Sequence, residues 1–95
     1  MGMNGLMDYA NFDGDTARSL PCRFHEDGSS VFFSFVEDGE QAFRGEVVGD
    51  GHWKLTNTTG NESRLELHRM PGDLTLIGFY VYPGSVNGFI RVYLE

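Results

Sequence analysis

Short segments of alternating apolar and polar residues follow one another along the chain, separated by Asp-Gly, Gly-Asn or Pro-Gly pairs. Alternation with a period of two is typical of a half-buried β-strand, and these pairs favour tight turns. Apolar residues do not keep helical spacing over a dozen positions anywhere in the sequence. The pattern predicts seven strands, at about residues 17–26, 30–37, 40–48, 52–57, 62–69, 73–82 and 88–95.

The turns constrain which residues of neighbouring strands face each other. A shift of one residue in the pairing moves every side chain of a strand to the other face of the sheet. A two-residue type I′ turn at Asp27-Gly28 pairs Phe24 with Val31 and Cys22 with Phe33. One face of this predicted hairpin is then wholly apolar.

The later turns keep that face in phase when their loops have three residues. A loop of Glu37, Asp38 and Gly39, with Gly39 in the left-handed conformation, pairs Phe33 with Phe43. Loops at 49–51 and 59–61 continue the same register. The further pairs are Val31 with Gly45, Val47 with Trp53, Gly45 with Leu55, Leu55 with Leu65, and Trp53 with Leu67.

A single inward face collects the apolar residues of the first five predicted strands. It contains Leu20, Cys22, Phe24, Val31, Phe33, Phe35, Phe43, Val47, Trp53, Leu55, Leu65 and Leu67. Gly45 lies within it and marks a bend or a close approach by another group. A long sheet with one apolar face must cover it, so we expect an all-β, antiparallel up-and-down meander that closes into a small barrel, with a two-layer β-sandwich as the alternative.

The chain length sets the domain organisation. At 95 residues the chain forms one domain, which we place at residues 16–95. Residues 1–15 are an arm that forms an extra strand or a short helix, or is disordered.

The last two predicted strands are apolar on both faces. We assign Ile77, Phe79 and Val81 to the core and pair Val81 with Ile90, which turns the other residues outward. The predicted outer surface consists of Leu74, Leu76, Tyr80, Tyr82, Phe89, Arg91 and Tyr93. In the opposite register the two faces exchange places, and an apolar surface remains outside.

An aromatic surface of this size, with an arginine, has the composition of an interface centre. We therefore expect a non-enzymatic interaction protein that forms homo-oligomers, with a dimer favoured, or binds a protein partner through its last two strands. In a competing interpretation, the N-terminal arm folds across the surface and covers it.

Two other functions fit parts of the pattern. The barrel could carry one small apolar ligand, in a site lined by Phe33, Phe43, Gly45, Trp53 and Phe79. It could also be a small enzyme that uses acidic residues of its turns, which share one end of the barrel. Those residues are Asp27, Asp50 and Asp73.

Candidate sites for charged ligands lie on the outer face. Four arginines fall on one predicted row across the sheet, interleaved with aromatic rings, and could bind an anion. They are Arg23, Arg44, Arg64 and Arg91. His52 and His68 are predicted to lie opposite each other, and they are weak metal candidates because a stable zinc site needs three or four ligands. We find no cofactor motif.

Charge and cysteine content restrict the partners and the compartment. The formal net charge of −7 disfavours binding to nucleic acid or to an anionic membrane. The one cysteine, Cys22, cannot form an internal disulfide, and the first residues lack a secretory signal pattern. We therefore expect a cytoplasmic protein.

Overall fold

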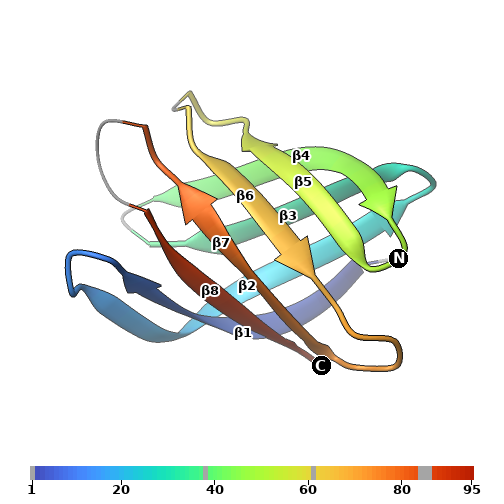
Figure 1. The fold of residues 1–95 in the computed structure, drawn as a ribbon, viewed down its shortest axis with the longest axis horizontal. Helices are drawn as coiled ribbons and strands as arrows, with labels where there is room; N and C mark the ends of the chain where they lie inside the picture. Colours follow the sequence, from blue (N-terminus) through green and yellow to red (C-terminus); the bar gives the residue numbers. More distant parts are fainter. Residues whose placement is uncertain (1, 38, 61, 84–86) are drawn as a thin grey trace.

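In a computed structural model, residues 2–37, 39–60, 62–83 and 87–95 are described. Eight strands form one sheet, in which each strand is antiparallel to the next and β1 also pairs with β8 (Figure 1). The strands are β1 (Gly2–Asn11), β2 (Thr16–Asp27), β3 (Ser30–Val36), β4 (Glu40–Gly49), β5 (His52–Asn57), β6 (Arg64–His68), β7 (Thr75–Val81) and β8 (Asn87–Leu94). The protein is an all-β, closed, up-and-down barrel, which confirms the predicted meander and excludes the sandwich. No helix of the length and apolar composition that a membrane span requires occurs among these residues.

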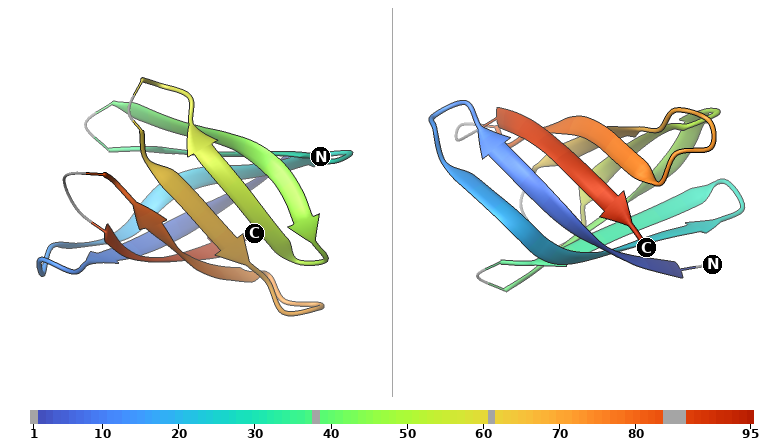
Figure 2. Two further views of the ribbon diagram at one scale, coloured as in Figure 1. Left: turned by 45° about the horizontal axis from the view of Figure 1, so that its top comes forward. Right: turned by 90° about the horizontal axis from the view of Figure 1, so that it is seen from below.

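The first residues of the chain form β1, which closes the barrel. β1 lies between β2 and β8, as the right-hand view of Figure 2 shows. Its inward side chain Met7 is buried in the core, whereas Leu6 is exposed. The extra-strand prediction for this segment is therefore correct, and the prediction of an arm folded across the outer surface is wrong. Without β1, both β2 and β8 would expose an unpaired row of backbone groups.

The pairs predicted from β3 to β6 are confirmed, but the three-residue loop predicted at 49–51 is wrong. Gly49 pairs with His52, so that loop has two residues, and a bulge between Val47 and Gly49 keeps the predicted register. Phe33 pairs with Phe43, Val47 with Trp53, and Trp53 with Leu67. Gly39 has φ +103°, as the three-residue loop requires. Asp38 and Asn61, which belong to two of the predicted loops, lie outside the described residues.

The first predicted hairpin is wrong by two residues. Asp27 pairs with Ser30, so the loop is Gly28–Ser29 and Phe24 pairs with Phe33. Gly28 has φ +63°, the conformation that a type II′ turn requires at its first central position. A type I′ turn would have required positive φ at Asp27 as well. Because the shift is even, the predicted inward face is preserved.

The inward face of β2 to β6 forms most of the core. Leu20 and Phe35 are partly buried against it, and Val47 is the exception because its side chain is exposed. The other predicted members are buried, namely Cys22, Phe24, Val31, Phe33, Phe43, Trp53, Leu55, Leu65 and Leu67.

The predicted orientation of β7 is wrong, while that of β8 is correct. Gly78, not Val81, pairs with Ile90, an odd shift that exchanges the two faces of β7. Leu76 is fully buried, and Ile77 and Phe79 are exposed. The six residues between β6 and β7 do not constrain the register, and β7 is apolar on both faces, so the pattern could not decide its orientation.

Inward-facing glycines explain which face of β7 turns inside. A Cβ atom on Gly78 would overlap the backbone carbonyl of Glu66, and one on Gly45 would overlap that of Lys54. Gly45 therefore marks a close approach of the neighbouring strand, one of its two predicted roles. The face of β7 that carries Gly78 can turn inward because Gly78 has no Cβ atom to collide with the backbone of β6.

The close approach at Gly45 makes a testable prediction. In Gly45→Ala we expect a free energy of unfolding lower by roughly 1–3 kcal/mol, because a backbone carbonyl cannot move aside as a flexible side chain can. Urea unfolding measures the change. The control is Gly49→Ala on the same strand, where the added Cβ makes an ordinary contact with the His52 ring. Equal losses in the two variants would contradict this explanation.

Candidate functional site: the outer surface of β1, β7 and β8

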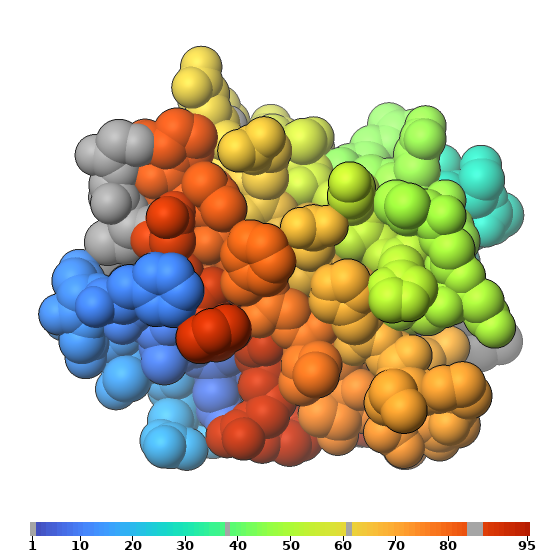
Figure 3. Space-filling model, in the orientation of Figure 1, coloured from blue at the N-terminus to red at the C-terminus, as the bar shows by residue number. Residues whose placement is uncertain are grey.

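The outer faces of β7, β8 and β1 carry a group of exposed apolar side chains. β8 lies between the other two, and residues directly opposite each other across these strands share a face. The side chains of the three strands adjoin on the face shown in Figure 3. We define the outer apolar surface as Leu6, Phe12, Ile77, Phe79, Phe89 and Tyr93, which are between 39% and 66% exposed.

Aromatic contacts hold this surface together. Phe79 pairs directly with Phe89 across the strands. The ring of Phe12, in the turn after β1, packs edge-on against Phe89 with the ring centroids 5.3 Å apart. Tyr93 pairs with Leu6 of β1. The N-terminal segment therefore contributes to the surface and does not cover it.

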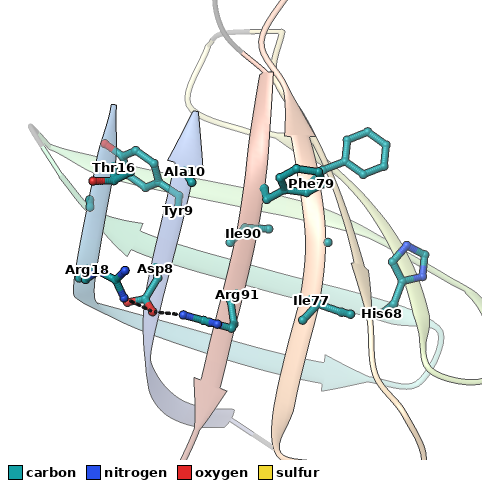
Figure 4. Close-up of a pocket in the computed structure, with 13 residues that line it drawn as sticks. Asp8, Tyr9, Ala10, Thr16, Arg18, His68, Ile77, Phe79, Ile90 and Arg91 are labelled. Carbon is teal, nitrogen blue, oxygen red and sulfur yellow. Dashed lines mark hydrogen bonds and ion pairs between the residues drawn. The ribbon is translucent and has the colours of Figure 1, made fainter. Parts of the chain in front are cut away.

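A shallow groove of about 480 Å³ runs along this face (Figure 4). Ile77 and Phe79 line its apolar side, and Asp8 lies between Arg18 and Arg91 on the other. Arg91 donates a hydrogen bond from Nη2 to Oδ2 of Asp8 over 3.2 Å, and Nη1 of Arg18 lies 4.0 Å from the same oxygen. The ion pair of Asp8 and Arg91 therefore lies on the row between that of Leu6 and Tyr93 and that of Phe79 and Phe89.

A β-bulge brings these charges together. Met7 pairs with Leu20 and Tyr9 with Ala17, so Arg18 and Ser19 both lie opposite Asp8. Ser19 has φ +58°, and it is the one non-glycine residue with positive φ in the described parts of the chain. Bulges redirect side chains and backbone groups in this way.

The bulge also sets the ionisation of Asp8. The backbone N–H of Ser19 donates to Oδ1 of Asp8 over 2.9 Å, and this bond is the main cause that lowers the pKa of the carboxyl group. Hydrogen bonding to Arg91 and the charge of Arg18 lower it further. The bond to Asp8 in turn raises the pKa of Arg91, whose guanidinium lies 5.3 Å from the centroid of the Tyr93 ring. Asp8 and Arg91 are thus both ionised at neutral pH.

The structure separates the residues predicted for the interface. Phe89, Arg91 and Tyr93 lie together on the outer face. Leu76 is buried and Tyr80 packs towards the core, which corrects their predicted outward orientation. The remaining two, Leu74 and Tyr82, are exposed just before and just after β7.

Six residues of the site were not predicted from the sequence, namely Asp8 and Arg18 among the charges and Leu6, Phe12, Ile77 and Phe79 among the apolar side chains. The last two were assigned to the core through the wrong register of β7. Asp8 and Arg18 carry no local signal, because their contact depends on a bulge in a strand pair that the pattern left open.

The predicted row of four arginines is interrupted. Arg44 and Arg64 lie on one row through Thr56, and Arg44 stacks over the Phe32 ring at 5.3 Å from its centroid. Arg23 pairs with Ser34 of β3, and Arg91 with Ile77 of β7. The shifts of two and three residues at the two hairpins displace these two arginines from the row, so the four do not form one anion site.

The predicted pairing of His52 with His68 is confirmed. Their Nδ1 atoms are 2.5 Å apart, and the ring centroids are separated by 4.7 Å. Within the described ranges, no group of three or more His, Cys, Asp or Glu side chains is arranged to hold a metal ion.

The residues predicted to line an internal ligand site do not surround one space. Phe33 and Trp53 are packed into the core, Phe79 lies outside the barrel, and the backbone of β5 occupies the space beside Gly45. Phe43 is different, because it lines a cavity of about 280 Å³ that we call the end cavity. The end cavity lies where β1, β3 and β7 end and β4, β6 and β8 begin.

The acidic residues considered for catalysis lie at the opposite end of the barrel. Asp27 ends β2, Asp50 lies in the turn after β4, and Asp73 precedes β7. All three are exposed.

No protein-family model and no curated protein matches the chain.

The ionised Asp8 makes a pH-dependent contribution to stability. Because its pKa is lowered on folding, this contribution is present above the ordinary value of about 3.9 and is lost as the pH falls through the lowered value. We expect Asp8→Asn to be less stable than the wild type at pH 7 and closer to it at pH 3. Urea unfolding at both pH values measures the difference, and a difference that does not depend on pH would contradict the assignment.

Proposed function

We propose that the protein is a non-enzymatic binding protein that associates with a second copy of itself through the outer apolar surface. The observation that supports this best is the group of six exposed apolar side chains on three neighbouring strands and the turn after β1, with one ion pair among them. Scattered apolar residues are normal on a protein surface, whereas a contiguous group marks an interaction site.

The charges beside the surface favour a second copy as the partner. Asp8 and Arg91 are neighbours, so in a two-fold symmetric dimer the pair of one subunit can face the same pair of the other. Each carboxylate would then have a guanidinium available in both subunits. The side chain of Arg91 is 49% exposed, so a partner can reach it.

The net charge opposes this association. Each copy carries a formal charge of −7, so two copies repel each other at long range. The attraction must come from apolar burial and from short-range contacts. Because salt screens the long-range repulsion, we expect the dimer to become tighter as NaCl is raised from 20 to 300 mM.

Phe89 is the best position for testing the interface, because it contacts both Phe79 and Phe12. In Phe89→Ser we expect the dimer dissociation constant to rise at least about tenfold, as for a central aromatic side chain. Sedimentation velocity over a range of protein concentrations measures this constant.

The matched control is Val48→Ser. Val48 is an apolar side chain of similar exposure, 59%, at the bulge of β4 and outside the outer apolar surface. We expect this variant to dimerise as the wild type does. A wild-type protein that stays monomeric at several hundred micromolar, or equal effects of the two substitutions, would refute the proposal.

A further inference from the structure

The end cavity is a separate feature from the outer apolar surface, and its lining combines an apolar floor with a polar rim. The floor consists of Met7, Phe35, Phe43, Leu65 and Ile90. The rim includes Tyr9, Asn11, Glu37, Tyr80 and Tyr82. Ligand sites commonly have this composition, with apolar walls and a few polar groups that orient the ligand.

The charge of the rim is negative. Glu37 is the one lining residue with a charged side chain, and no Lys, Arg or His lines the cavity in the described part of the chain. The hydroxyl group of Tyr9 donates to the carboxylate of Glu37 over 2.8 Å. Two further acids, Asp13 and Asp15, lie close enough to influence Tyr80: burial raises the pKa of Tyr80 to about 12, and Asp13, Glu37 and Asp15 add to the rise. A positively charged group would be favoured here.

Aromatic rings provide a second attraction for a cation. The rings of Tyr9 and Tyr80 meet edge to face with centroids 6.2 Å apart, and those of Phe35 and Phe43 are stacked at 6.3 Å. The faces of aromatic rings attract ammonium groups, and the attraction grows when the site is partly shielded from water.

The carboxylate of Glu37 indicates a ligand with N–H groups. It accepts the hydroxyl hydrogen of Tyr9 and retains acceptor capacity, since a carboxylate has about four lone-pair sites. A primary ammonium group carries three N–H donors, whereas a quaternary ammonium group has none.

The volume limits the size of the ligand. A cavity of about 280 Å³ lies near the lower end of the range of roughly 300–1,000 Å³ that is usual for small-molecule sites. We therefore expect a small ligand.

We propose that the end cavity binds a small primary amine in its protonated form, with its ammonium group at Glu37 and its compact apolar body against the floor. The ammonium group is paired with the carboxylate and the rings of Tyr9 and Tyr80. The hydrocarbon body packs against Phe43 and Leu65. This inference is independent of the proposed dimer, because it uses a different part of the molecule.

Three probes of nearly equal size and different charge test the inference. They are 2-phenylethylamine, its neutral analogue 2-phenylethanol, and the anion phenylacetate, each titrated into the wild-type protein at pH 7 with isothermal calorimetry. We expect saturable binding of the amine, at least tenfold weaker binding of the alcohol, and no binding of the anion. Absence of amine binding at millimolar concentration, or equal affinity for amine and alcohol, would overturn the proposal.

Two matched variants locate the charge that is responsible. Glu37→Gln retains an acceptor for Tyr9 but removes the charge, and we expect it to lower the affinity for the amine at least tenfold. Glu40→Gln removes the same charge from an exposed residue at the same end of the barrel that does not line the cavity, and we expect little change. Equal losses of amine affinity in the two variants would show that the attraction depends on the overall charge of this end of the barrel and not on Glu37. That result would refute the proposed site.

A third variant separates this inference from the dimer proposal. Phe89→Ser, which is designed to break the dimer, is expected to bind 2-phenylethylamine as the wild type does. Each proposal can therefore fail while the other stands.

Discussion

β1 pairs with β2 along one edge and with β8 along the other, and through this double pairing the backbone hydrogen bonds of the sheet close on themselves. Closure of eight strands requires each strand to tilt and coil, which brings backbones of neighbouring strands close together inside the barrel. The inward positions Gly5, Gly45 and Gly78 accept this approach because they have no Cβ atom. The same requirement determines which face of β7 turns inward, and therefore which of its side chains remain outside.

The outer apolar surface is a product of closure. Asp8 and Arg91 are 83 residues apart in the sequence, and they meet because β1 is the neighbour of β8. The bulge opposite Asp8 supplies a backbone N–H and a second guanidinium from β2, so the carboxylate is held by three groups. A charged pair fixed in this way can lie beside apolar side chains without a large cost of desolvation, because it keeps its hydrogen bonds.

The two ends of the barrel interior differ in chemistry. At one end Phe24 packs edge-on against Trp53, with centroids 5.2 Å apart, and Arg69 lies over the indole ring. At the other end, tyrosine rings and one carboxylate surround the end cavity. The barrel interior therefore has an aromatic cluster beneath a guanidinium group at one end and the end cavity at the other. The proposed preference of the end cavity for cations follows from its one carboxylate and its aromatic rings.

The sequence by itself determined the fold class, seven of the eight strands to within two residues, and the register from Phe33 opposite Phe43 to Trp53 opposite Leu67. This was possible because an alternating pattern with one apolar face permits only even shifts, and even the displaced first hairpin kept Phe24 inside. Only the tertiary structure decided the closure of the sheet into a barrel, the orientation of β7, the role of the first residues, and the full membership of both candidate sites. β7 is apolar on both faces, so neither orientation is favoured until its neighbours crowd Gly78. The contacts of Asp8 with Arg91 and of Tyr9 with Glu37 join distant parts of the chain, and such contacts exist only once the sheet has closed.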